Sequence, residues 1–162
     1  MVRILGVDPG SACTGYGIIT ADGDKVVYVE SGHLTLKKNT NRYEKLRSIF
    51  LRIKQVIEEQ TPTHFAIEDI FYSKNARSSL ILGEARGAAI LAATLANLPV
   101  YEYSAREVKQ SVTGNGAADK SQVNYMLGKI LGLTETPENT DESDAIAVAV
   151  CHAFKNREWS VK

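Results

Sequence analysis

The chain has 162 residues, of which 44% are hydrophobic and 23% charged, and its 19 basic and 19 acidic side chains cancel to a formal net charge of zero. This composition excludes a disordered chain and predicts one compact domain over residues 1–162. No wholly apolar run approaches the roughly 20 residues of a membrane helix, and no signal peptide opens the chain, so we expect a cytoplasmic protein without a membrane partner.

The first third of the chain predicts a β-meander followed by a helix. Alternating apolar residues indicate strands over residues 3–8, 15–21 and 25–36, with turn signals at Pro9-Gly10-Ser11 and Asp22-Gly23-Asp24 between them. Asn41 and Glu44 form a capping pair, after which apolar residues recur at helical spacing until Pro62. One amphipathic helix is therefore expected between Asn41 and Pro62.

The rest of the chain alternates strands and helices. We predict a buried strand over residues 64–70, a basic loop over 72–78, an Ala- and Leu-rich helix over 79–97 and a strand over 100–103. Capping boxes at Ser104/Glu107 and Asp119/Gln122 begin two further helices, and a last helix follows the loop of residues 134–139. This order predicts an α/β fold with a five-stranded mixed sheet.

Four acidic residues lie within or next to apolar segments that are expected to form the core: Asp8, Glu68, Asp141 and Asp144. Asp8 ends the first strand, at the sheet edge where α/β proteins bind ligands, and Glu68 interrupts an apolar strand. Asp141 and Asp144 lie three apart at the start of a helix that is apolar all round from Ala145. Each has a structural alternative: a turn cap for Asp8, a solvated edge strand for Glu68, and a favourable helix dipole for the last pair.

A buried carboxylate without a partner costs several kcal/mol, so convergence of the four would call for a hard divalent metal. Such a metal would cancel the negative charge of the four carboxylates locally. The remaining surface would then carry about four more positive than negative charges, which could bind phosphates. The histidines His33, His64 and His152 are expected in the core or on the surface rather than as ligands. Cys13 and Cys151 lack the spacing of a zinc site or a disulfide framework, and both are expected to be buried.

Several short motifs occur along the chain from the first strand to the last helix: Gly6-Val7-Asp8-Pro9-Gly10, Thr14-Gly15-Tyr16-Gly17, Phe65-Ala66-Ile67-Glu68, Lys74-Asn75-Ala76, Glu84-Ala85-Arg86-Gly87, Lys109-Gln110, Lys120-Ser121-Gln122-Val123 and Asp141-Glu142-Ser143-Asp144-Ala145. Together these motifs resemble the RuvC family of Holliday-junction resolvases. The resemblance implies a ribonuclease H-like fold with helices on both faces of the sheet. It also implies Mg²⁺-dependent nicking of four-way DNA junctions during recombination and repair.

Carried over by position, the resemblance makes Asp8, Glu68, Asp141 and Asp144 the catalytic and metal-binding residues. Phosphodiester hydrolysis with two Mg²⁺ ions about 4 Å apart suits such carboxylates, and Mn²⁺ is a further possibility. Asp8, nearest the sheet centre, is expected to bridge the ions.

The segment 71–77 is aromatic and basic, which suits unstacked bases and bent backbones, although Phe71 could equally end a core strand. The resemblance favours stacking by Phe71 and places Lys109 and Lys120 near the scissile phosphate, whereas an exposed lysine is ordinarily solvated surface. Contacts with DNA are therefore expected at Phe71, Tyr72, Lys74, Arg77, Lys109 and Lys120.

Two symmetric cuts require two active sites, so a homodimer is expected. Small residues of the 79–97 helix, among them Ala85, Ala89, Ala92 and Ala93, would allow two copies to approach, although one face of this helix must pack on its own sheet. The resemblance further implies cooperation with the RuvA and RuvB branch-migration proteins. Two alternatives stay open. The segment Asp8-Pro9-Gly10-Ser11 resembles the phosphate loop of actin-like ATPases and sugar kinases, so the chain could be an ATPase domain of that type. It could also be a junction-binding module without catalysis.

Overall fold

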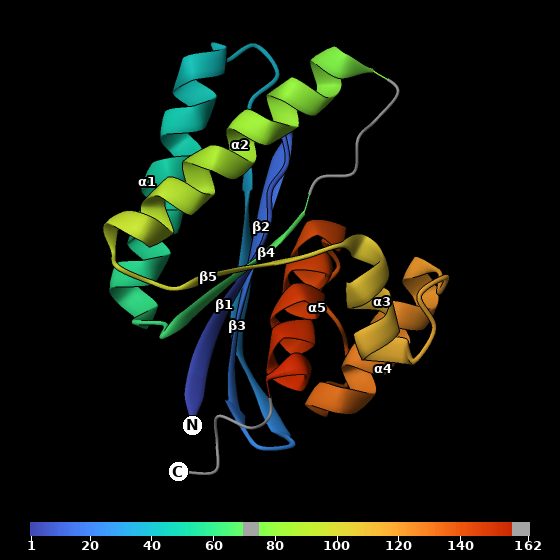
Figure 1. Cartoon of the computed structure of the whole chain (residues 1–162). Coiled ribbons are helices and arrows are strands. Elements are labelled where there is room, and N and C mark those ends of the chain that lie inside the picture. Colours follow the sequence, from blue (N-terminus) through green and yellow to red (C-terminus); the bar gives the residue numbers. More distant parts are fainter. Residues whose placement is uncertain (70–74, 157–162) are drawn as a thin grey trace.

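A single five-stranded mixed sheet forms the centre of the computed structural model, which describes residues 1–69 and 75–156 (Figure 1). The strands are β1 Val2–Asp8, β2 Cys13–Asp22, β3 Lys25–Thr35, β4 His64–Glu68 and β5 Val100–Tyr103, in the order β3-β2-β1-β4-β5. β1, β2 and β3 pair antiparallel, while β1, β4 and β5 pair parallel. The predicted mixed sheet is confirmed, with β1 as its central strand.

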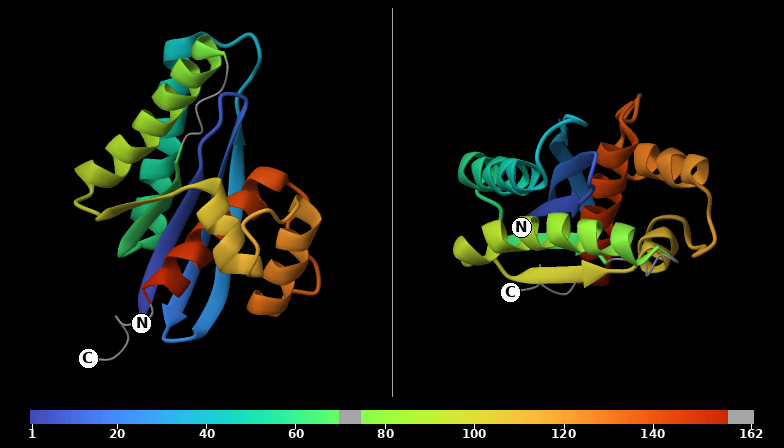
Figure 2. Two further views of the ribbon diagram at one scale, coloured as in Figure 1. Left: turned by 45° about the vertical axis from the view of Figure 1, so that its right-hand side comes forward. Right: turned by 90° about the horizontal axis from the view of Figure 1, so that it is seen from above.

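Helices cover both faces of the sheet, as predicted. α1 Arg42–Gln60 and α2 Ala76–Leu95 lie on one face, and α3 Ala105–Thr113, α4 Lys120–Leu131 and α5 Thr140–Lys155 lie on the other (Figures 1 and 2). α5 packs directly against the middle of the sheet, and α3 and α4 pack outside it.

The period of two along β1 divides its side chains between two cores. Leu5 and Val7 are fully buried under α1 and α2, while Ile4 is buried on the face covered by α5. By the same alternation Gly6 and Asp8 face α5. The catalytic candidate at the end of the central strand therefore points to the α5 side of the sheet.

Helix caps explain where the predicted boundaries hold and where they were wrong. The capping boxes at Ser104/Glu107 and Asp119/Gln122 are both formed. α2 begins three residues earlier than expected, because the Asn75 side chain accepts hydrogen bonds from the amides of Arg77 and Ser78. Arg77 thus belongs to the first turn of a helix and not to a loop.

The predicted pairing of Asn41 with Glu44 is only half right. The Asn41 side chain caps α1 by accepting from the amide of Tyr43, while the Glu44 carboxylate lies 3.5 Å from Arg47. The described part of the fourth strand ends at Glu68, so that this carboxylate stands at the end of the strand and not within it.

α2 is the one helix within residues 1–69 and 75–156 that is long and apolar enough, by composition, to cross a membrane. In this fold its residues Ala85, Ala89, Ala92 and Ala93 are buried in the core beneath α1 and the sheet. For these four alanines the structure therefore confirms the alternative of packing within the chain, and they do not face a second copy. Leu80, Leu91 and Leu95 are the large apolar side chains that α2 leaves exposed.

Candidate active site

Two neighbouring strands bring Asp8 and Glu68 to the same corner of the sheet. β1 and β4 are parallel, with Val7 opposite Ile67, so both carboxylates follow at the carboxyl ends of adjacent strands. Val7 and Ile67 are buried on the α1/α2 face, which turns the next residue of each strand to the α5 face. This is the side on which the other two acidic residues lie.

The first turn of α5 delivers Asp141 and Asp144. The Asn139 side chain caps this helix by accepting from the amides of Asp141 and Glu142. The helix lies unusually close to the sheet because it crosses three glycines. A side chain on Gly6 would collide with the carbonyl of Ala145, one on Gly15 with the carbonyl of Asp141, and one on Gly17 with Ile146. The glycines therefore set the distance between α5 and Asp8.

Three of the four acidic residues and two lysines line one open hollow of about 260 Å³, bounded by Asp8, Glu68, Asp144, Lys109 and Lys120. The Lys120 Nζ atom donates to Asp144 Oδ2 at 2.8 Å. Asp141 is not among the residues that line this hollow, but it lies near Cys13 and close enough to Asp8 to act electrostatically on both residues. The structure thus brings all four acidic candidates together, with the hollow open to solvent.

Burial and mutual repulsion make this an electrostatically costly cluster. Burial, followed by the charges of Glu68, Asp144 and Asp141, raises the pKa of Asp8 from 3.8 to about 8, against a smaller opposing effect of Lys120. Burial and then Asp144 raise the pKa of Glu68, while Lys120 and Lys109 lower it. The lysines therefore compensate the carboxylates only in part, as expected of a site built for a further cation.

The donor set fits a hard divalent metal completed by substrate. Within the described ranges, no three His, Cys, Asp or Glu side chains are gathered tightly enough to form a ready-made metal cage. Mg²⁺ is usually held by only one or two carboxylates together with phosphate oxygens and water. Asp8, at the centre of the cluster and with a strongly raised pKa, is the carboxylate that most lacks a positive partner.

Glu142, which is not one of the four acidic candidates, links the start of α5 to β3 through its carboxylate. Its carboxylate accepts a hydrogen bond from Ser31 Oγ at 2.7 Å and lies 2.5 Å from Nδ1 of His33. Gly15 pairs with Asp8 on one side and with His33 on the other, so these three residues form one row across the sheet beneath the helix. The only signal in the sequence was the position of Glu142 between two candidate aspartates.

Arg86, from the Glu84-Ala85-Arg86-Gly87 motif, plays a comparable part for Glu68. Its Nε atom donates to the Glu68 carbonyl oxygen at 3.2 Å, and its guanidinium lies 2.7 Å from Glu102 and 3.6 Å from Asp69. The side chain is mostly buried and joins α2 to the ends of β4 and β5. Arg86 therefore fixes the backbone from which Glu68 projects.

The expectations for cysteines and histidines hold in part. Cys151 is buried, but Cys13 is only half-buried, and burial followed by a hydrogen bond with Asp141 raises its pKa to about 12. His152 lies in the core, 2.7 Å from the Tyr103 hydroxyl and 3.3 Å from His64. His33 is a surface residue, paired with Glu142.

The predicted DNA contacts fall into three groups. Lys109 and Lys120 line the acidic hollow. Arg77 lines a different hollow, on the α1/α2 side of the sheet. Phe71, Tyr72 and Lys74 lie outside the described residues.

Comparison with known proteins identifies relatives over nearly the whole chain. The profile of the family described as crossover junction endodeoxyribonuclease RuvC matches residues 4–152. The RuvC protein of Pseudoalteromonas translucida is 50% identical over 157 residues, covering 97% of this chain and 89% of that protein. The RuvC protein of Saccharophagus degradans is 49% identical and covers 94% of this chain and 87% of its own length.

Solved structures agree with this result. T. thermophilus RuvC in complex with a Holliday junction substrate superposes with a TM-score of 0.92 at 31% identity, covering 99% of this chain and 98% of that one. The yeast mitochondrial Holliday junction resolvase Ydc2 superposes with a TM-score of 0.67 at 13% identity, a likeness of fold alone.

Proposed function

The chain belongs to the RuvC family of crossover junction endodeoxyribonucleases and resolves Holliday junctions, and we propose that it does so as a single nuclease domain whose catalytic residues are Asp8, Glu68, Asp141 and Asp144. One observation carries this assignment: Asp8, Glu68 and Asp144 share an open hollow with two lysines at the carboxyl end of the central strand. Such a hollow combines oxygen donors for a divalent cation with ammonium groups for a phosphate.

Asp8 is the central ligand of the proposed site, with Glu68 on one side and Asp141 and Asp144 on the other. Bound to these oxygens, two Mg²⁺ ions, or Mn²⁺ in their place, would polarise the scissile phosphate and lower the pKa of an attacking water. The chain contributes the fixed spacing of the carboxylates, because the glycines under α5 and the Arg86 contact to Glu68 hold both sides of the cluster.

Lys120 and Lys109 serve the phosphate in this proposal. The Lys120 ammonium group donates to Asp144 and lines the same hollow in which the scissile phosphate would bind. Positive groups already in place stabilise the charge that builds up on the phosphorus-bound oxygens during in-line attack.

The enzyme acts as a homodimer in this proposal, because symmetric resolution needs two sites related by a two-fold axis. Leu95 of α2 lines a groove together with Phe50 and Ile57 of α1, and with the exposed Leu91 of the same helix it supplies an apolar surface for the second copy. We place the enzyme in the cytoplasm, working with RuvA and RuvB on migrating junctions. Sedimentation at micromolar concentration tests the dimer, which a purely monomeric profile would contradict.

A nicking assay on a synthetic four-way junction tests the catalytic assignment. Wild-type protein with Mg²⁺ should nick opposing strands symmetrically, and Asp8→Asn should lose nicking while still binding the junction, because affinity rests mainly on phosphate contacts. Glu135→Gln, a charge removal on an exposed loop, serves as the control. Normal nicking by Asp8→Asn would refute the assignment, and binding without nicking by the wild type would return the chain to the class of binding modules.

The actin-like ATPase alternative has lost its support. It depended on the turn after Asp8, and a family profile that spans residues 4–152 accounts for that turn as part of an endonuclease. Adding ATP to the nicking assay should therefore change nothing.

A further inference from the structure

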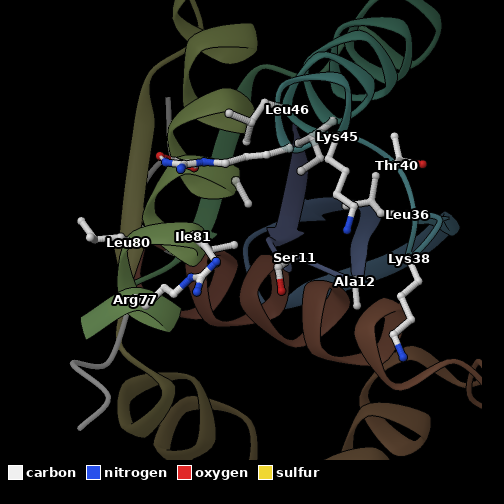
Figure 3. A pocket seen from close by; sticks show the side chains of 14 residues that line it. Ser11, Ala12, Leu36, Lys38, Thr40, Lys45, Leu46, Arg77, Leu80 and Ile81 are labelled. Carbon is white, nitrogen blue, oxygen red and sulfur yellow. Dashed lines mark hydrogen bonds and ion pairs between the residues drawn. The ribbon is translucent and has the colours of Figure 1, made fainter. Parts of the chain in front are cut away.

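A second hollow, larger than the acidic one, opens on the opposite face of the sheet. It has a volume of about 610 Å³ and lies between the turn after β1, the segment that joins β3 to α1, and the first turns of α1 and α2. Ser11 and Ala12, only three and four residues after Asp8, form part of its wall (Figure 3). The two hollows therefore flank the end of the same strand.

The floor of this hollow is apolar. Leu36, Ile49 and Ala85 are buried at its base, and Leu46 and Ile81 continue the apolar wall up the sides of α1 and α2. A site that bound only phosphate groups would not need an apolar floor of this kind. Its shape and lining suit a ligand that carries an apolar portion next to its charge.

The rim, in contrast, is strongly basic. Lys38, Lys45 and Arg77 line it, and Figure 3 shows the cationic groups of Lys45 and Arg77 on opposite sides of the hollow. No carboxylate of residues 1–69 or 75–156 lies within ion-pairing distance of these three side chains. The one acidic residue of the lining, Glu84, is already paired with Arg42. The hollow therefore carries about three uncompensated positive charges in a chain whose net charge is zero.

We propose that this hollow is a second DNA-contact site, which holds the deoxyribose-phosphate backbone of a junction strand as it continues past the acidic site. Phosphates would bind Lys38, Lys45 and Arg77, and the apolar faces of the sugars would lie against Leu36, Leu46 and Ile81. The proposal rests on the junction-cleaving function and extends it by assigning substrate contacts to Lys38 and Lys45. Neither lysine belongs to the motifs that the family resemblance selected.

Charge decides between DNA and a second copy of the chain as the occupant. In a two-fold symmetric dimer centred on this hollow, Lys38, Lys45 and Arg77 would each face the same cations of the other copy. Like charges brought together across an interface repel each other and disfavour such a dimer. A polyanion, by comparison, gains from all three cations at once.

The first experiment measures how junction binding depends on salt, in EDTA so that no strand is cut. Removing a phosphate contact lowers the slope of log Kd against log salt concentration by about 0.7 to 0.9. The double variant Lys38→Met/Lys45→Met should therefore lower the slope by about 1.5 and weaken binding about tenfold near 0.15 M salt. Lys25→Met, at the opposite end of the sheet, is the matched control and should bind like the wild type.

The second experiment identifies what occupies the hollow. A photocrosslinking amino acid is placed at Leu80, an exposed lining residue, or at Leu51, an exposed residue of α1 outside the hollow. Crosslinking to a junction strand from position 80 but not from position 51 supports the proposal. Crosslinking from position 80 to a second protein chain overturns it, and so does a salt slope that the double variant leaves unchanged.

These outcomes stay distinct from failure of the function itself. If the wild type does not bind the four-way junction, both the proposed function and this inference are refuted. If the wild type binds and nicks the junction while the double variant keeps the wild-type slope, only the second contact site is refuted.

Discussion

The pKa of Asp8 yields a prediction that does not depend on measuring activity. Replacing Asp8 by Asn should stabilise the metal-free protein at neutral and alkaline pH, because it removes a carboxylate that the fold holds in an unfavourable environment. Well below pH 3.8 the carboxyl group is neutral in both the folded and the unfolded chain, so the variant should gain little there. Between pH 4 and pH 8 the unfolded chain ionises Asp8 while the folded chain keeps it protonated. The free energy of unfolding of the wild type should therefore fall across this window.

The magnitude follows from the two pKa values. At about 1.36 kcal/mol per pKa unit, a pKa raised from 3.8 to about 8 corresponds to at most about 6 kcal/mol above pH 8. Asn keeps a buried polar group in place, so we expect a gain of about 2–4 kcal/mol. For a chain of this size the corresponding rise in Tm is about 5–10 °C.

Thermal unfolding in EDTA at pH 5 and at pH 8 checks this expectation. Asp8→Asn should raise Tm more at pH 8 than at pH 5, and Glu135→Gln should change neither value. Added Mg²⁺ should raise the Tm of the wild type and have little effect on Asp8→Asn, because the metal then supplies the missing positive charge. A variant that is less stable than the wild type at pH 8 would show that Asp8 serves as a turn cap, and the electrostatic reasoning would be wrong.

Three further predictions concern residues around the cluster. Lys120→Met should slow nicking of saturating junction about 100-fold, because it removes an ammonium group from the phosphate side of the site, whereas Lys129→Met on the same helix should not. Glu142→Gln should weaken the hold of Ser31 and His33 on α5 and reduce the Mg²⁺-induced rise in Tm, with Glu138→Gln as control. His152 is buried in its neutral form with a pKa lowered to about 4, so its contribution to stability is complete above pH 6.5 and is lost as the pH falls toward 4. His152→Gln should therefore reduce the loss of unfolding free energy between pH 7 and pH 5 by about 2 kcal/mol, measured by urea denaturation.

Much of the fold could be predicted from the sequence because the apolar patterns that indicate strands and helices agree with the turn and capping residues between them. Apolar alternation located the first three strands, a buried apolar run located β4, and the capping boxes at Ser104 and Asp119 placed two helix starts correctly. The start of α2 was misplaced because a strand-to-helix connection rich in basic and aromatic residues has no apolar periodicity. Its signal is a single side chain, Asn75, whose capping role depends on the backbone geometry of residues that follow it.

The carboxylates of the proposed site could be predicted from the sequence, but the residues that hold them in place could not. Asp8, Glu68 and Asp144 stand out in sequence because each interrupts or adjoins an apolar segment. Glu142 and Arg86 do not stand out, since their partners are contributed by β3, β4 and β5, far away along the chain. The second hollow is harder still to predict, because its three cations come from three separate segments and only packing of α1 against α2 brings them together.

The turn after β1 connects these two parts of the molecule. Asp8 faces α5, and three residues later Ser11 lines the hollow on the opposite face. Thr14 holds this turn in place, since its hydroxyl group donates to the Gly10 carbonyl and accepts from the Gly10 amide, at 3.2 and 3.3 Å. A strand bound in the second hollow would thus be held at a fixed offset from the carboxylates. Contacts with the DNA backbone on one face of the sheet would then help to place the scissile phosphate at the proposed carboxylate site on the other face, where it would be hydrolysed.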